Sequence, residues 1–244
     1  MNWRSQRKFC AILAINSTDQ QPLDRLAKLS INLKFPFPSG FAMVASTPAA
    51  PSVPPSRGDR LSLTDYWQQE AIAEQRHEYH DGIRVAMAGG SEAHSKIAVN
   101  LVAFLHFALR DTDWQVYNSD LRVWIPDYRC CTYTDGMVVW GEPEFHGDRN
   151  DEILNPGLIV EVLSPSTERY DRGEKFRKYR SLPSFQDYLL ISAEEPYIEH
   201  YCKTDAAVWT FTSYGEINAA LWLNNLQISI PLAEIYRRVN FPSS

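Results

Sequence analysis

The stretch "GLIVEVLSPSTERYDRGEKFRKYR", residues 157–180, is the part of the sequence that most clearly indicates the fold. Residues 158–163 are mostly branched aliphatic side chains, which is typical of a strand buried on both faces. Residues 164–166, Ser-Pro-Ser, end that strand. Residues 171–181 have the pattern of a helix that stops before Pro183. The stretch therefore predicts a buried strand followed by a helix.

The flanking sequence supplies further helices and strands. Ser62 or Thr64 caps a first helix, and Asp81-Gly82 is a strong turn signal for a β-hairpin. Ser91 caps a long amphipathic helix, whose apolar stripe is Ile97, Leu101, Phe104, Leu105 and Ala108. Strand-like runs cover residues 114–119, 121–126, 132–140, 187–192, 198–203, 207–214 and 217–223, and a short helix lies within 230–239. This order predicts an α/β fold, a mixed β-sheet flanked by helices with a C-terminal β-hairpin or meander extension.

The first 60 residues differ from the rest in composition. Six prolines lie among the 21 residues 35–55, with Ser, Ala and Thr between them, which is typical of a disordered linker. The apolar run at residues 9–15 is short for a signal sequence and no cleavage site follows it. We therefore expect residues 1–60 to be a disordered or non-native extension, with Met43 an alternative start. The folded domain is expected at residues 61–244.

Charge and cysteine content limit the function classes. Residues 61–244 contain 16 Lys/Arg and 27 Asp/Glu, a net charge of −11, so nucleic acid could be bound only through a local basic patch or bound metal ions. No apolar run approaches the roughly 18 residues that a membrane span needs, so we expect no membrane partner. The cysteines show no CxxC spacing and predict free thiols in a reducing cytoplasm: Cys10, Cys130, Cys131 and Cys202.

Two acidic residues interrupt otherwise apolar strands. Asp135 lies within residues 132–140, and Glu161 lies within residues 158–163. Burying an unpaired carboxylate costs roughly several kcal/mol, so each needs a partner. Two carboxylates on neighbouring strands can share one Mg²⁺ ion, which prefers oxygen ligands. The alternative is that each forms a separate structural ion pair or hydrogen bond.

The helix after Glu161 presents a second cluster. Asp171, Lys175 and Tyr179 share one helix face because they are spaced i, i+4, i+8. Residues 168–180 contain six cations and three anions, so the face is either a solvated basic surface or a site where Lys175 reaches a phosphate. Glu78, before the hairpin turn, and His94, at the start of the long helix, are weaker candidates, since a lone histidine there is more often a surface or capping residue.

At these positions the sequence resembles a known family. "EYHDG", "MAGGSEAHSKIAVNL", "YTDGMVV" and the run from "LIVEVL" to "DYLLIS" are similar to the Uma-type family of putative restriction endonucleases, which belongs to the PD-(D/E)xK nuclease superfamily. The resemblance covers about residues 60–240. It implies a restriction-endonuclease-like fold and a Mg²⁺-dependent endonuclease that hydrolyses phosphodiester bonds in DNA, with Mn²⁺ able to substitute.

The resemblance also implies roles for individual residues. Asp135, Glu161 and the backbone carbonyl of Val162 would bind the metal, and Lys175 would complete the catalytic set. The supporting residues would be Glu78 (also a second-metal candidate), His94, Asp171 and Tyr179, with Arg172 and Lys178 contacting phosphate.

Three positions depart from the superfamily signature. Thr134 replaces the proline of "PD", and Leu163 stands at the lysine position of the E-x-K triplet, so the lysine function passes to Lys175. Gly136 replaces a branched apolar residue and predicts a looser strand beneath the metal site.

Two other function classes remain open. A catalytically inactive nuclease-fold protein could bind nucleic acid or a protein partner. An unrelated α/β protein could hold the same residues in structural ion pairs. We also expect a homodimer, with the exposed strands of residues 198–222 as its interface.

Overall fold

The buried strand predicted at residues 158–163 is β8 (Pro156–Leu163), an inner strand of a six-stranded sheet. The structure is a computed structural model that describes residues 60–241. The predicted extension at residues 1–60, including Cys10 and Met43, therefore lies outside the described residues except for Arg60. All eight residues of β8 are buried, as its composition predicts.

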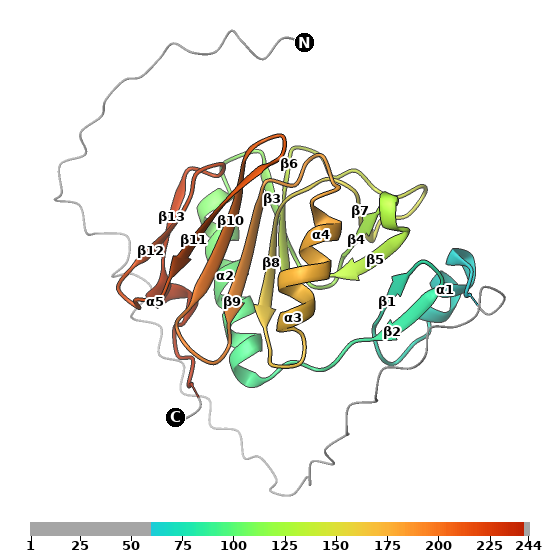
Figure 1. The fold of residues 1–244 in the computed structure, drawn as a ribbon, viewed down its shortest axis with the longest axis horizontal. Helices are drawn as coiled ribbons and strands as arrows, with labels where there is room; N and C mark the ends of the chain where they lie inside the picture. Colours follow the sequence, from blue (N-terminus) through green and yellow to red (C-terminus); the bar gives the residue numbers. More distant parts are fainter. Residues whose placement is uncertain (1–59, 242–244) are drawn as a thin grey trace, which may run out of the picture. The chain divides into compact units, whose positions relative to one another are not determined.

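Three sheets make up the described chain (Figure 1). The six-stranded sheet has the order β11 (Val208–Tyr214), β10 (Ile198–Asp205), β9 (Asp187–Ser192), β8, β6 (Gly136–Trp140) and β3 (Trp114–Asn118). The five-stranded sheet has the order β2 (Ile83–Ala86), β1 (His77–His80), β5 (Cys130–Tyr133), β4 (Arg122–Ile125) and β7 (Glu152–Ile153). The third sheet pairs β12 (Ala220–Leu223) with β13 (Ile228–Pro231). Only the β8–β9 and β4–β7 pairs are parallel among those described, so the sheets are mixed, as predicted.

The helices are short except for one. They are α1 (Leu63–Glu70), α2 (Glu92–Leu109), η1 (Pro126–Tyr128), α3 (Glu168–Tyr170), η2 (Asp171–Lys175), α4 (Phe176–Tyr179) and α5 (Leu232–Ile235). Ser62 caps α1 and Ser91 caps α2, each accepting a hydrogen bond from a backbone N–H, as predicted. Asp81 and Gly82 both have positive φ in the β1–β2 turn, which confirms the hairpin.

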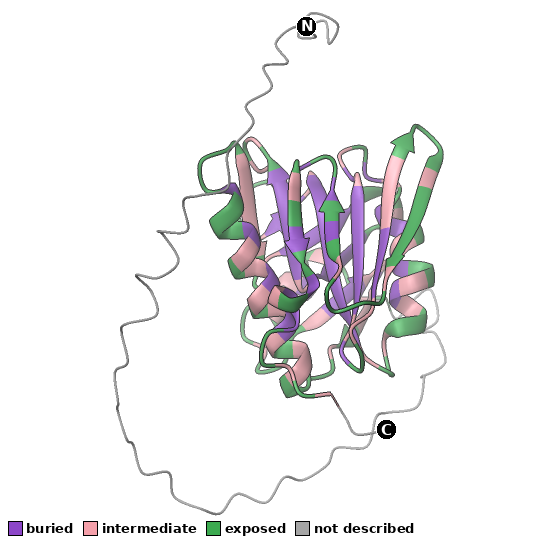
Figure 2. Ribbon diagram, turned by 90° about the vertical axis from the view of Figure 1, so that its left-hand side faces the viewer, coloured by how far each residue is buried: buried purple, intermediate pink, exposed green. Residues whose placement is uncertain are grey.

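The two faces of the six-stranded sheet pack against different elements. One face packs on α2 and on the β12–β13 hairpin through residues such as Leu158, Val160 and Leu189. The other packs on the α3–α4 segment through Tyr179 and the aromatic side chains around Phe185. Figure 2 shows buried strands at the centre and long exposed stretches on the outer hairpin, where β11 is mostly exposed. Because side chains alternate along a strand, Glu161 faces the α3–α4 side.

The structure differs from three local predictions. Residues 132–140 are not one strand: β5 ends at Tyr133 and β6 begins at Gly136, and the two belong to different sheets. In α2, Leu109 rather than Ala108 completes the buried stripe. The third strand of the predicted meander, β12, pairs with β13 instead of β11. The strand break and the pairing of β12 depend on contacts between distant strands. The difference in α2 is a shift of one residue along the helix.

The helix predicted at residues 171–181 begins earlier and has an unusual centre. The helical segment spans residues 168–179, and its middle turn, η2, is a π-helix that contains Asp171 and Lys175. Single π turns inside α-helices are rare and often lie at functional sites.

The predictions on cysteines and on membrane-spanning helices can be compared with residues 60–241. Cys130, Cys131 and Cys202 are free thiols, as predicted. None of the helices in this part of the chain has the length and apolar character that crossing a bilayer requires.

Candidate active site

The break between β5 and β6 positions Asp135. Its backbone N–H donates to the carbonyl of Val160 (3.0 Å), and its carboxylate Oδ2 accepts from the N–H of Val162 (2.7 Å). These two bonds attach Asp135 to the β8 residues on either side of Glu161. Asp135 therefore lies in the short link between β5 and β6, where the chain passes from one sheet to the other, next to the strand β8 that carries Glu161.

Gly136 fixes the approach of α2 to this point. A Cβ at this position would lie 3.1 Å from Cγ2 of Val102, so the strand is closely packed here. The looser strand predicted from Gly136 is therefore wrong: Gly136 is buried and paired with Val160. At the start of the same helix, His94 places Nε2 3.2 Å from Oδ2 of Asp135.

Lys175 lies at the centre of a buried charge cluster, which we call the Lys175 cluster. Its ammonium is 2.8 Å from Oε1 of Glu161, 3.6 Å from Oε1 of Glu78 and 3.7 Å from Oδ1 of Asp171. It also donates to the carbonyl of Tyr133 (2.9 Å). The side chains of these four charged residues are at most 10% exposed. The i, i+4 spacing predicted for Asp171 and Lys175 therefore brings both to the carboxylates.

Electrostatics keep Lys175 charged. Burial alone would lower the pKa of its ammonium, but Glu161, Glu78 and Asp171 outweigh this effect and raise it well above its usual value. Burial raises the pKa of Glu161, against the opposing effect of Lys175, with Asp171 and Asp135 adding to the increase. The pKa of His94 is raised chiefly by its hydrogen bond to Asp135. A further cation beside Glu161 would therefore stabilise its ionised form.

Tyr179 holds the carboxylate of Glu161 in place through a hydrogen bond. Its hydroxyl donates to Oε1 of Glu161 (3.0 Å) and lies 3.0 Å from the hydroxyl of Thr132. It is fully buried and does not line the cavity described below. Tyr179 therefore contacts a candidate catalytic carboxylate but is shielded from any bound substrate.

The carboxylate oxygens of Asp135 and Glu161 are suitable ligands for a hard divalent cation such as Mg²⁺. Oδ2 of Asp135 and Oε1 of Glu161 are engaged by protein groups, whereas Oδ1 of Asp135 and Oε2 of Glu161 form no hydrogen bond within residues 60–241. Two carboxylate oxygens without a protein donor, beside a strand carbonyl, match the oxygen preference of Mg²⁺. Both oxygens of Glu78 have partners, Lys175 and His80, so Glu78 is better suited to orienting Lys175 than to binding a metal.

Sequence reasoning missed His80. Its Nε2 lies 3.0 Å from Oε2 of Glu78, and its Nδ1 lies 2.9 Å from Sγ of Cys130 and 3.2 Å from Nζ of Lys178. Lys175 and His80, against the opposing effect of burial, lower the pKa of Glu78. His80 precedes Asp81-Gly82, so the hairpin signal explained its position without indicating a role in the site.

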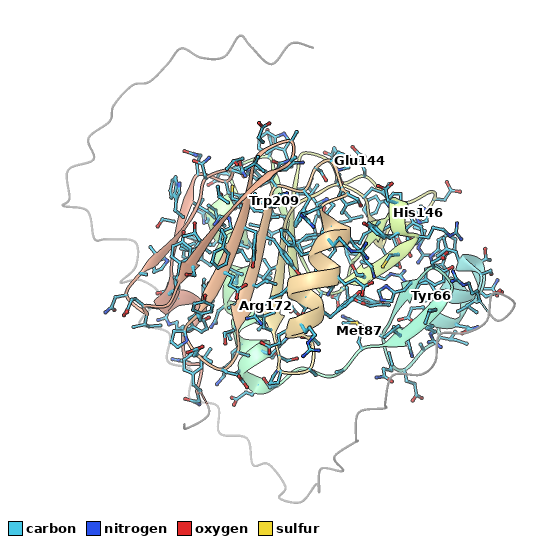
Figure 3. The ribbon with its side chains drawn as sticks, viewed as in Figure 1. Tyr66, Met87, Glu144, His146, Arg172 and Trp209 are labelled. Atoms are coloured by element: carbon cyan, nitrogen blue, oxygen red, sulfur yellow. The ribbon has the colours of Figure 1, made fainter. Side chains whose placement is uncertain are left out.

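A cavity of about 850 Å³ opens over the cluster. Its lining includes the predicted residues Glu78, His94, Asp135, Glu161, Val162, Asp171, Lys175 and Lys178. Its lining also includes Arg76 and Met87, and Met87 lies on the segment that links the β1–β2 hairpin to α2 (Figure 3). The catalytic residues predicted from sequence thus line one cavity that also contains apolar and cationic groups.

The two predicted phosphate contacts are already paired. Arg172, labelled in Figure 3, bonds to Glu168 (2.6 Å) and to Glu199 (3.0 Å) on β10. It is not among the residues that line the cavity. Lys178 lines the cavity but lies 3.3 Å from Glu174 and is 6% exposed. Their contact with phosphate remains a prediction.

One cluster of metal-binding residue types was not predicted at all. Within residues 60–241, the only group of three or more His, Cys, Asp and Glu ligand atoms that all lie within 4.8 Å of one another is Asp187, His200 and Cys202. It is separate from the cavity and lies on the other face of the six-stranded sheet. The local signal was His200 and Cys202 at i, i+2 in a strand.

Comparisons with known proteins agree with this picture. The sequence profile of the Uma2 family, described as "Putative restriction endonuclease", matches residues 63–232. Two uncharacterized proteins of Synechocystis sp. PCC 6803 are similar: slr1290 is 39% identical, over 82% of this chain and 100% of its own length, and sll1609 is 33% identical, over 69% and 95%.

A solved structure has a similar fold. The crystal structure of a putative nuclease of DUF820 from Anabaena variabilis superposes with a TM-score of 0.58, covering 72% of this chain and 97% of that one, at 16% identity. Identity this low supports the fold alone, which is the nuclease-like mixed α/β fold predicted above. Taken with the family match over most of the described residues, the chain belongs to the Uma2 family of putative restriction endonucleases.

Proposed function

We propose that this protein is a metal-dependent endonuclease that hydrolyses phosphodiester bonds in DNA. The observation that carries the proposal is the arrangement of Asp135, Glu161 and Lys175 around one cavity. Within residues 60–241, one oxygen of each of the two carboxylates has no hydrogen-bond donor. The cavity volume of about 850 Å³ is large enough for part of a nucleic-acid strand. Family membership supports the same reaction class.

Asp135, Glu161 and the Val162 carbonyl would hold Mg²⁺ or Mn²⁺. When bound, such an ion polarises a phosphoryl oxygen and lowers the pKa of a coordinated water. Tyr179 and the Val162 N–H hold the two carboxylates in place through one oxygen each. This leaves the second oxygen of each carboxylate directed by the protein and available to the cation.

Lys175 would stabilise charge on the reacting phosphate. Its ammonium is fixed by the Tyr133 carbonyl and by three carboxylates, so its position is set before substrate binds. Glu78 keeps that ammonium charged, and His80 holds Glu78. His94, hydrogen-bonded to Asp135, would contact the same carboxylate or a phosphate oxygen.

The test is cleavage of supercoiled plasmid with Mg²⁺ or Mn²⁺. We expect Asp135→Asn, Glu161→Gln and Lys175→Met each to lower the rate by about 100-fold or more, the typical effect of removing a group that stabilises transition-state charge. Glu234→Gln and Lys203→Met, which lie away from the cavity, should cleave like the wild type. Equal cleavage by all six proteins would show that any nuclease activity arises elsewhere.

A non-cleaving nuclease-fold binder is the second candidate. The observation that favours it is the 2.8 Å contact between Lys175 and Glu161, which supplies one cationic partner without any metal ion. Such a protein would retard labelled DNA in a gel in the absence of cleavage, and Glu161→Gln would not change its affinity. Metal-dependent cleavage by the wild type would eliminate this candidate.

A further inference from the structure

A second cluster of ligand-type side chains lies on the face of the sheet opposite the cavity. Asp187 begins β9, and His200 and Cys202 lie on β10, its antiparallel neighbour. The register pairs Cys202 directly with Asp187, and His200 is two residues away on the same face. One carboxylate oxygen, one imidazole nitrogen and one sulfur therefore lie within 4.8 Å of one another.

The carboxylate of this cluster is buried, and within residues 60–241 its only ion-pair partner is the imidazole of His200. Asp187 has a fully buried side chain, and its Oδ1 lies 2.7 Å from Nε2 of His200. Its Oδ2 accepts from the amide of Asn225 (2.7 Å). No lysine or arginine in residues 60–241 lies within 4.0 Å of it. A buried carboxylate in such surroundings is stabilised by a positive charge, which a metal ion would supply.

Asn225 connects this cluster to another sheet. It lies in the turn between β12 and β13, and its amide nitrogen is 3.8 Å from Sγ of Cys202. A half-turn of the amide group would present its oxygen at the same place. The amide oxygen would then lie beside Asp187 and Cys202 and could be the fourth ligand, the number that Zn²⁺ prefers.

A catalytic thiol is the competing explanation for the same residues. Nε2 of His200 lies 2.7 Å from Oδ1 of Asp187, so this nitrogen is directed at the carboxylate rather than at the thiol as a base. None of the three residues lines the cavity described above. Both observations favour a metal site over a cysteine hydrolase at these residues.

We propose that Asp187, His200 and Cys202, completed by Asn225, form a zinc site that holds the β12–β13 hairpin against the central sheet. The mixed nitrogen, sulfur and oxygen donors favour Zn²⁺ over Mg²⁺, whereas the donors around Glu161 favour Mg²⁺. The two sites therefore select different metals on opposite faces of one sheet. The zinc site does not depend on the proposed nuclease activity.

Cobalt titration of the full chain tests the proposal. Co²⁺ replaces Zn²⁺ in such sites, and sulfur ligation produces a charge-transfer band in the near ultraviolet. The titration is made in an Asp135→Asn, Glu161→Gln background, so that the proposed nuclease site contributes no binding. We expect one equivalent of Co²⁺ to produce the band, Zn²⁺ to remove it, and an excess of Mg²⁺ to leave it unchanged.

Two cysteine variants provide the control. Cys202→Ser should abolish the band and the rise in melting temperature that Zn²⁺ causes. Cys130→Ser, which removes a buried thiol on the five-stranded sheet, should retain both. His200→Ala should weaken cobalt binding at least 10-fold. Absence of the band in the parent protein, or its survival in a folded Cys202→Ser variant, would overturn the proposal.

Discussion

Two buried charge clusters in this protein differ in what surrounds them. The Lys175 cluster opens onto a cavity of about 850 Å³, and two of its nearby carboxylate oxygens lack a protein donor. The second cluster, which we call the Arg122 cluster, lies in the five-stranded sheet, where Arg122 bonds to Asp151 and to Tyr66 and lies 3.3 Å from Glu152. None of these residues lines that cavity.

In the Arg122 cluster, the buried charged groups are hydrogen-bonded to one another and to neighbouring side chains. Glu152 is fully buried, and its two oxygens lie 2.7 Å from Nε1 of Trp67 and 2.8 Å from Nδ1 of His146. The side chain of Arg122 is 3% exposed. These hydrogen bonds join α1, β4 and β7, and both oxygens of Glu152 are engaged by protein groups. The comparison shows that unfilled bonding capacity, rather than buried charge as such, distinguishes the candidate active site.

The largest effect is expected in the Arg122 cluster. Arg122→Ala would leave Glu152 buried without its strongest cation, so we expect the free energy of unfolding to fall by about 3–5 kcal/mol. Arg149→Ala, a more exposed arginine of the same cluster, should cost less than about 1 kcal/mol. Urea unfolding followed by tryptophan fluorescence measures both. Equal losses in the two variants would contradict the importance assigned to burial.

Substitution of Lys175 should reduce activity strongly and stability only modestly, in contrast to substitution of Arg122. Lys175→Met is expected to lower the cleavage rate by about 100-fold or more while destabilising the fold less than Arg122→Ala does. The reason is that water and protons reach the remaining carboxylates through the cavity. Cleavage and urea unfolding are measured on the same preparations. If Lys175→Met unfolds the protein as severely as Arg122→Ala, the cluster is structural.

The next largest effect is a loss of stability when the packing of Gly136 against α2 is disturbed. Gly136→Ala places a Cβ 3.1 Å from Val102, so we expect a loss of about 1–3 kcal/mol from overpacking. Val102→Ala in the same chain should recover part of that loss. Gly173→Ala, whose Cβ meets nothing within 4 Å, serves as the control and should not be destabilising. Additive losses for Gly136→Ala and Val102→Ala would exclude a direct contact.

The smallest effect is a difference in pH dependence. Although burial opposes it, Arg149 and Arg122 lower the pKa of Asp151, so its stabilising contribution is present above its unfolded pKa and is lost as pH falls through the folded value. Burial raises the pKa of Asp171, despite Lys175, so the wild type loses stability as pH rises from the unfolded to the folded value.

Two variants distinguish the opposite pH dependences of stability expected for Asp151 and Asp171. Relative to wild type, Asp151→Asn should be less stable near neutral pH and approach it in acid, by no more than about 1 kcal/mol because Asp151 is partly exposed. Asp171→Asn should compare more favourably with wild type at neutral pH than in acid. Unfolding free energies between about pH 3 and pH 7 measure both. Parallel pH profiles for the two variants would contradict the assigned shifts.

Local sequence predicted the candidate site better than it predicted the sheets. The buried run around Glu161, the helix spacing of Asp171 and Lys175, and the Asp81-Gly82 turn are all short-range signals, and the structure agrees with each. The switch of sheets at Asp135 was not predicted, because the β-branched and aromatic residues on either side of Asp135-Gly136 read as one strand over residues 132–140.

Two further features depend on pairing between distant strands. The contact of Asp187 with His200 and Cys202 depends on the register of β9 against β10, which no local pattern in either strand specifies. The link from His80 to Lys178 joins residues 98 positions apart in the chain. Non-local contacts of this kind become visible only in the folded structure.

The π turn at η2 sets the rotational phase of the segment that carries Asp171 and Lys175. Each residue of an α-helix advances the rotation by about 100°. Removing one residue between Asp171 and Lys175 would place them three positions apart instead of four and change the direction of Asp171 relative to the ammonium. A change in the length of this turn should therefore be tolerated less well than a substitution at the exposed Gly173, because the contact of Asp171 with the ammonium would be lost.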